Sequence, residues 1–169
     1  MQGLDLRLDR EPTVGEVLAD IAAREITKYQ ELVFCGFGEP LSRFRDLIAI
    51  GKKVKERYCL PVRINTNGQG NLIAGRDITP ALKGIVDAVS ISLNAKNPTA
   101  YQALCQSVYG EAAFTAVLDF AGKCRQYIPQ VILSVVDILP ADDIAACREI
   151  ARQIGGEFKV RPLVDCRDR

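Results

Sequence analysis

The sequence contains no histidine among its 169 residues. This absence excludes Ser-His-Asp triads, histidine-liganded metal sites and the commonest general base at neutral pH. No stretch approaches the ~20 consecutive apolar residues that would cross a bilayer. The start, MQGLDLRLDREP, also lacks the basic-then-apolar pattern of a secretory signal. We therefore expect a cytoplasmic protein with no membrane partner.

Closely spaced cysteines are also missing. Six cysteines are present, but no two of them form a CxxC or CxxxC pair, the local clamp that usually begins a zinc or iron–sulfur site. We expect reduced, structural thiols, with Cys35 packed as a small apolar residue of a strand. Neither sign of charge predominates, because the chain has 22 Lys and Arg residues and 21 Asp and Glu residues. Without a basic block, no nucleic-acid partner is expected.

What the sequence does contain is a regular alternation of apolar runs and amphipathic stretches. The apolar runs are short and rich in Val, Ile and Leu, which is typical of parallel strands buried on both faces. The five runs are Glu31–Phe37, Val62–Asn67, Ala88–Asn94, Val131–Ile138 and Phe158–Val164. Helical patterns separate them, so residues 1–169 are predicted to form one α/β domain of repeated βα units.

Two segments between the runs give more specific signals. Thr13 and Glu16 form a capping box that predicts a helix. The segment Asn67–Thr79, NGQGNLIAGRDIT, is the longest stretch expected to be irregular, and long loops of this kind are often functional.

Small and hydrogen-bonding residues gather where the predicted strands end. In parallel α/β sheets, ligands bind at these carboxyl ends. The residues are Gly36, Gly38 and Glu39; Asn65, Thr66 and Asn67; Ser92 and Asn94; Asp137; and Arg161. Each of them alone could serve only a turn, a helix cap or an ion pair. Together they indicate a binding site for an extended, zwitterionic small molecule, because glycines let a ligand approach the backbone and a carboxylate can bind an ammonium group.

These motifs resemble those of the radical S-adenosylmethionine (radical SAM) superfamily. GFGEP resembles that superfamily's Gly-Gly-Glu-Pro motif, and NTNG and SISLNA resemble the endings of its next two strands. Along nearly the whole chain, the sequence is similar to the TatD-associated radical SAM proteins. The resemblance implies a partial (β/α)6 TIM-like barrel of parallel strands, here with five strands and the first one missing.

The resemblance also implies roles for the residues at the strand ends. Gly36, Gly38 and Glu39 would meet the methionyl amino group of S-adenosylmethionine. Ser92 and Asn94 would bind its ribose or carboxylate, Asn67 would face the cofactor, and the substrate would meet Asn65, Thr66, Asp137 and Arg161. The family cleaves this cofactor reductively with a 4Fe-4S cluster to start radical chemistry on a substrate, here an unknown one.

The family holds its cluster on a CxxxCxxC loop after the first strand, and this sequence has neither. We therefore expect no metal ligands here and no radical chemistry from this chain alone. The alternatives are a cluster-free module that binds S-adenosylmethionine or a nucleoside, and a partner subunit of a split enzyme. The apolar run Glu31–Phe37 would then be a free sheet edge, and we expect it to self-associate or to capture a partner that carries the first strand.

A different enzyme class also fits some of these residues. Glu39, Asp137 and Arg161 at one barrel mouth could form the acid/base site of a cofactor-free lyase or isomerase.

Overall fold

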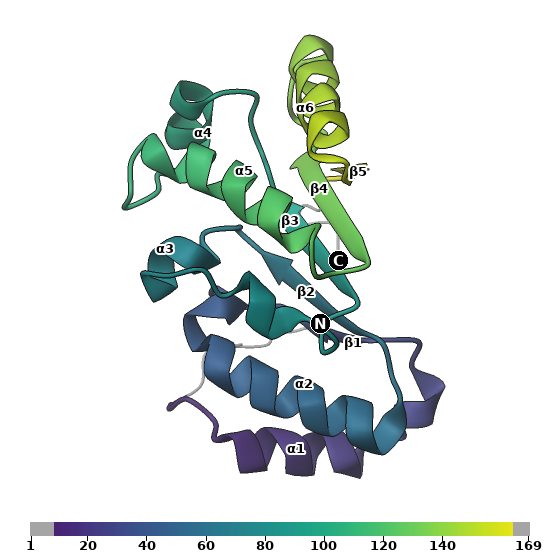
Figure 1. Cartoon of the computed structure of the whole chain (residues 1–169). Coiled ribbons are helices and arrows are strands. Elements are labelled where there is room, and N and C mark those ends of the chain that lie inside the picture. The colour runs from purple at the N-terminus through teal and green to yellow at the C-terminus, as the bar shows by residue number, and fades with distance from the viewer. Residues whose placement is uncertain (1–8, 164–169) are drawn as a thin grey trace, which may run out of the picture.

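The computed structural model describes residues 9–163, which form five parallel strands with helices between them (Figure 1). The strands are β1 (Leu32–Phe34), β2 (Val62–Thr66), β3 (Ala88–Ser92), β4 (Gln130–Val136) and β5 (Glu157–Arg161). The α-helices are α1 (Val14–Ala23), α2 (Phe44–Tyr58), α3 (Gly70–Ala74), α4 (Pro98–Cys105), α5 (Ala112–Cys124) and α6 (Ala141–Ile154). Three 3-10 helices complete the order: η1 (Ile26–Lys28), η2 (Pro40–Arg43) and η3 (Thr79–Leu82).

The strands lie in the sheet in the same order as in the sequence, β1-β2-β3-β4-β5, and every pair is parallel. In a doubly wound sheet the order in which successive strands are added changes direction at one point. Here each strand is added next to the previous one in a single direction, as in a barrel. The predicted α/β fold, a partial TIM-like barrel of parallel strands, is therefore confirmed.

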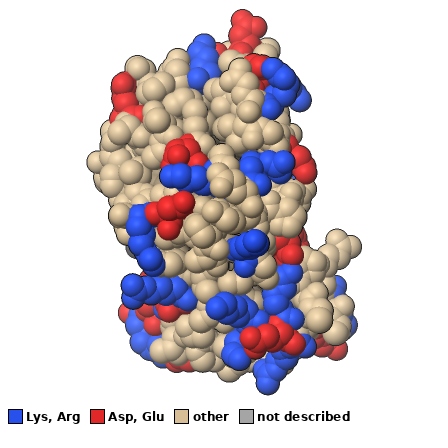
Figure 2. All heavy atoms as spheres, viewed as in Figure 1, with Lys and Arg blue, Asp and Glu red and all other residues tan. Residues whose placement is uncertain are grey.

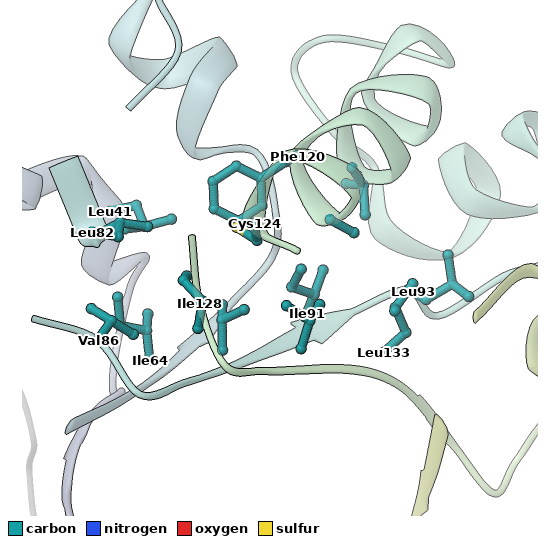
Figure 3. Packing of buried hydrophobic residues seen from close by; sticks show 14 of the residues in the cluster. Leu41, Ile64, Leu82, Val86, Ile91, Leu93, Phe120, Cys124, Ile128 and Leu133 are labelled. Atoms are coloured by element: carbon teal, nitrogen blue, oxygen red, sulfur yellow. The ribbon is translucent and has the colours of Figure 1, made fainter. Parts of the chain in front are cut away.

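The helices cover one face of the sheet, and the hydrophobic core lies between the two layers. Figure 3 shows Ile64, Ile91 and Leu133 of the strands facing Phe120 and Cys124 of α5, and all five are fully buried or nearly so. The strand residues between them point to the opposite face and are more polar. Among the described residues, no helix covers that face, which includes Arg63, Asn65, Ser90, Ser92 and Lys159.

Local signals explain where the elements begin and end. The capping box predicted for α1 is present: the Thr13 hydroxyl accepts from the Glu16 N–H, and the Glu16 carboxylate accepts from the Thr13 N–H. Helix α6 ends at Ile154 and is followed by Gly155, whose left-handed conformation suits a helix C-terminus.

Two expectations about local structure were wrong. The segment Asn67–Thr79 is not irregular throughout, since it contains α3 and the start of η3. Cys35 is exposed rather than packed, because β1 ends at Phe34, one residue earlier. Of the other described cysteines, Cys124 and Cys147 are buried, Cys105 is half-buried and Cys59 is exposed.

The structure contains no helix, within residues 9–163, that is both long and apolar enough to cross a membrane. On the face seen in Figure 2, basic and acidic side chains lie side by side.

Candidate functional site

The GFGEP segment forms a turn after β1, and its main chain is accessible at the two glycines. Gly36 has φ +146° and Gly38 has φ +122°, values that residues with a side chain rarely adopt. A Cβ atom at either position would meet nothing within 4 Å. The glycines are therefore required by the backbone conformation, and the result is main chain that a ligand can approach closely.

Glu39 connects this turn to the end of β2. Its carboxylate accepts three hydrogen bonds: from the Leu41 N–H at 3.0 Å, the Thr66 hydroxyl at 2.7 Å and the Asn67 N–H at 2.8 Å. Glu39 also stands at the N-terminal end of η2. Because both carboxylate oxygens are occupied by the protein, Glu39 holds the two strand ends in position relative to each other.

The end of β2 is ordered by its own side chains. The Thr66 hydroxyl accepts from the Gly68 N–H at 3.0 Å, and the Asn67 side-chain oxygen accepts from the Gln69 N–H at 2.8 Å. Asn65 lies on the uncovered face of the sheet, where its oxygen accepts from Arg63 at 2.8 Å. The side-chain oxygens of all three predicted residues in this segment, Asn65, Thr66 and Asn67, are therefore engaged within the protein.

A cavity of about 440 Å³ lies at the carboxyl ends of the strands. Four of the predicted residues line it: Asn67 after β2, Ser92 and Asn94 at and after β3, and Arg161 in β5. Its other lining residues are Gln69, Tyr101, Leu104, Cys105, Val136, Ile138 and Leu139. We call this space the strand-end cavity. The structure therefore brings residues of three separate strand ends around one space.

Asn94 has two features that are unusual for a side chain beside a cavity. Its backbone has φ +60°, the left-handed region that costs a non-glycine residue energy. Its side-chain N–H₂ donates to the Cys105 sulfur at 3.5 Å, while its buried oxygen has no hydrogen-bond partner among the described residues. An unpaired buried acceptor is costly, so this oxygen is available to a donor on a ligand.

The other predicted residues lie apart from the strand-end cavity. Gly36, Gly38 and Glu39 line a second cavity of about 330 Å³ between the β1 turn, α1 and α2. Asp137 is exposed, and its carboxylate accepts from the Leu163 N–H at 2.7 Å. Glu39, Asp137 and Arg161 therefore do not share one of these cavities, so the geometry gives no support to an acid/base site made of those three.

Tyr101 and Gln69 are parts of the strand-end cavity that the sequence reading missed. The Tyr101 hydroxyl accepts from the Gln69 side chain at 3.0 Å, and the Gln69 oxygen accepts from the Ser107 hydroxyl at 2.9 Å. Burial raises the pKa of Tyr101 above its ordinary value, which keeps the phenol neutral. The signals available were the single tyrosine in the helix opened by Asn97 and the extra amide in NGQGN.

The described residues do not fit an iron–sulfur cluster. Within residues 9–163, no group of three His, Cys, Asp or Glu side chains is placed to hold a metal. Burial raises the pKa of the Cys124 thiol, and it raises that of Cys147 to about 11, which disfavours the thiolate that binds iron. Cys166 lies outside the described residues.

No protein-family model matches the sequence, and no curated protein matches it. Among solved structures, the chain is similar to a radical SAM methyltransferase from Sphaerobacter thermophilus, with a TM-score of 0.58 and 15% identity. The chain shares the fold of this methyltransferase. The likeness covers 92% of this chain and 59% of the methyltransferase, so the chain spans less than two thirds of that protein's length. At this identity the comparison establishes the fold, and activity needs separate support.

Proposed function

We propose that this chain is the S-adenosylmethionine-binding part of a radical SAM protein. The observation that carries the proposal is the convergence of Asn67, Ser92 and Asn94 on one cavity at the strand ends of a fold shared with a radical SAM methyltransferase. The sequence likeness to the TatD-associated radical SAM proteins, which extends along nearly the whole chain, belongs to this proposal as well.

The proposed binding mode uses groups that the protein leaves accessible. The cofactor would extend across both cavities: the open backbone at Gly36 and Gly38, in the cavity beside β1, would face its methionyl end, while the Ser92 hydroxyl and the unpaired Asn94 oxygen, in the strand-end cavity, would face its ribose. Glu39 would act by holding the β1 turn against Asn67. The cofactor would supply the reactive sulfonium group, and the residues of this chain would orient it.

The iron–sulfur step is not part of what we propose for the described residues, since they offer no cluster ligands. In this proposal the 4Fe-4S cluster, if one takes part, is held by protein outside residues 9–163. The alternative is a module that binds S-adenosylmethionine or a related nucleoside without a cluster.

Calorimetric titration with S-adenosylmethionine tests the proposal. Ser92→Ala removes one hydroxyl from the cavity wall, so the affinity should fall by about 3- to 10-fold, as expected for one lost hydrogen bond. Ser90→Ala is the matched control, because Ser90 lies two residues earlier on the same strand face and does not line the cavity. If wild-type protein gives no saturable heat, or if both variants bind alike, the proposal is wrong.

We also propose that the free edge of β1 is an association surface. Among the described residues β1 pairs only with β2, and Leu32, Val33 and Phe34 are each partly exposed. Such an edge presents unpaired backbone groups to another strand. A second copy of this chain, or a partner that supplies a further strand, would complete it.

A further inference from the structure

The wall of the strand-end cavity has an uneven chemical character. Towards β4 and α4 it is apolar, through Leu104, Val136, Ile138 and Leu139. Among the described residues that line it, Arg161 is the one ionisable residue besides Cys105 and Tyr101, and none is acidic. The portion of a ligand that lies near β4 and β5 would therefore contact an apolar surface and one positive charge.

Arg161 is held in place without neutralisation of its charge among the described residues. Its backbone is fixed by pairing with Val136 and by the hydrogen bond that the Asp137 N–H donates to its carbonyl at 3.0 Å. Its buried Nε has no hydrogen-bond partner within residues 9–163. The nearby carboxylate of Asp137 is turned to the Leu163 N–H instead. A buried guanidinium N–H without a partner is costly, and an anion would satisfy it.

Asn94 adds a requirement of the opposite kind. Its free oxygen needs a hydrogen-bond donor, while its N–H₂ group is already engaged with Cys105. The proposed function uses this neutral acceptor for the ribose of the cofactor, which leaves the cationic donor of Arg161 and the apolar wall for another molecule.

From this arrangement we infer that the side of the cavity at β4 and β5 takes a second molecule, the substrate, and that this substrate is an anion with an apolar body. Its carboxylate or phosphate group contacts Arg161, and its apolar body packs against Leu104, Val136, Ile138 and Leu139. The inference rests on the proposed function, in which the cofactor occupies the side at β1 to β3.

A matched series of small probes tests the charge requirement. Phenyl phosphate and phenylacetate are anionic, benzyl alcohol is neutral and phenethylamine is cationic, with a similar apolar body in all four. In calorimetric titrations at low ionic strength, at least one anion should bind more tightly than the alcohol, and the amine should bind least. The better of the two anions then distinguishes phosphate from carboxylate chemistry. Equal binding of anion and amine would overturn the inference.

Variants at two positions of β5 test whether Arg161 binds the anion. Arg161→Gln should weaken binding of the preferred anion by about tenfold or more, the order expected for a lost hydrogen bond to a charged group. Lys159→Gln removes the same charge two residues away on the same sheet face, outside the cavity lining, and should leave anion binding unchanged. Arg161→Lys should recover part of the affinity, and thermal unfolding checks that each variant is folded. Equal behaviour of the Gln variants at 161 and 159 would contradict the assignment.

Titration of the same variants with S-adenosylmethionine separates this inference from the proposed function. Arg161→Gln should leave cofactor affinity within about twofold of the wild type, because Arg161 serves the second molecule. An equal loss of cofactor and anion binding would assign Arg161 to the cofactor and overturn the inference while the proposed function stood. Anion binding without any cofactor binding would reject the proposed function instead.

Discussion

At the scale of single residues, Glu39 determines the shape of the site. Its carboxylate spans the gap between the β1 turn and the end of β2 through bonds to Leu41, Thr66 and Asn67. A carboxylate can accept all three because it has two oxygens and no hydrogens. An amide has only one such oxygen, so the arrangement depends on the charged side chain.

Glu39→Gln should therefore lower the free energy of unfolding by about 2 kcal/mol, since the amide N–H₂ would face a backbone N–H. Urea unfolding followed by circular dichroism measures this change. Glu56→Gln is the matched control: Glu56 is exposed and pairs only with Lys53 at 2.9 Å, a contact that contributes little. Equal stability of the two variants would show that Glu39 does not hold the strand ends together.

Sequence alone could predict part of the site at this scale. The polar residues at strand ends follow from the apolar runs, and Asn67, Ser92, Asn94 and Arg161 do line one cavity. The hydrogen bonds of Glu39 could not be predicted, because they join residues 27 and 28 positions apart whose register only the folded sheet fixes. Tyr101 was missed for a different reason: a buried tyrosine in an amphipathic helix has the same pattern as an ordinary core residue.

At the scale of elements, the space around a helix determines whether alanine can replace a glycine in it. Gly51 lies in the interior of α2, where a Cβ atom would come within 2.7 Å of the Ile85 side chain. Gly122 lies in α5, where a Cβ atom would meet nothing within 4 Å. Alanine favours a helix over glycine at both positions, so only the surroundings differ.

Gly122→Ala should raise the free energy of unfolding by about 0.5–1 kcal/mol, because the helix gains without a clash. Gly51→Ala should lower it by about 1 kcal/mol, since overpacking against Ile85 exceeds the gain in helix propensity. Urea unfolding of both variants gives the comparison. If both substitutions stabilise the protein equally, α2 does not approach Ile85 as closely as described.

The elements themselves could largely be predicted from the sequence. Each of the five apolar runs overlaps a strand, because Val- and Ile-rich segments between turn residues are typical of a parallel sheet; β4 and β5 each begin one residue before their run. Their ends were less predictable: β1 stops at Phe34, three residues before the end of its apolar run. The short helix α3 was missed, since five residues beginning with a glycine carry no clear helical period.

At the scale of the whole molecule, stability should depend on an ion pair between Glu31 and Arg63. Glu31 precedes β1, and Arg63 of β2 donates to its carboxylate at 2.7 Å. These hydrogen bonds from Arg63 hold the pKa of Glu31 below its ordinary value of 4.5, with a smaller contribution from the charge of Lys159 in β5. A carboxyl with a lowered pKa in the folded state stabilises the protein above its unfolded pKa and loses that effect as the pH falls.

The urea midpoint of the wild type should therefore fall as the pH is lowered from about 5 to about 3. Glu31→Gln should reduce this pH dependence, because the substitution removes the titrating carboxyl. Glu16 and Glu149, whose pKa values are also lowered, are present in both the wild type and the variant, so their contributions remain equal. A variant with the same pH dependence as the wild type would show that the pair does not contribute.

The free β1 edge should make the protein associate. Light scattering after size-exclusion chromatography should give a mass above the monomer at tens of micromolar, and Val33→Lys should shift it to the monomer, because a lysine on an edge strand blocks pairing. Val108→Lys is the control, since Val108 is a highly exposed apolar residue outside β1, at 92% exposure. A clean wild-type monomer would count against association through this edge.

The most direct test of the account is to locate the bound cofactor on the wild-type chain, whose 18.6 kDa suits amide NMR spectroscopy. Titration with S-adenosylmethionine should shift the amide resonances of Gly36, Gly38, Asn67 and Asn94 together and saturably. These residues surround the proposed position of the cofactor at the ends of β1, β2 and β3. Shifts confined to the outer helices, or no shifts at millimolar cofactor, would contradict the claim that the strand ends form its binding site.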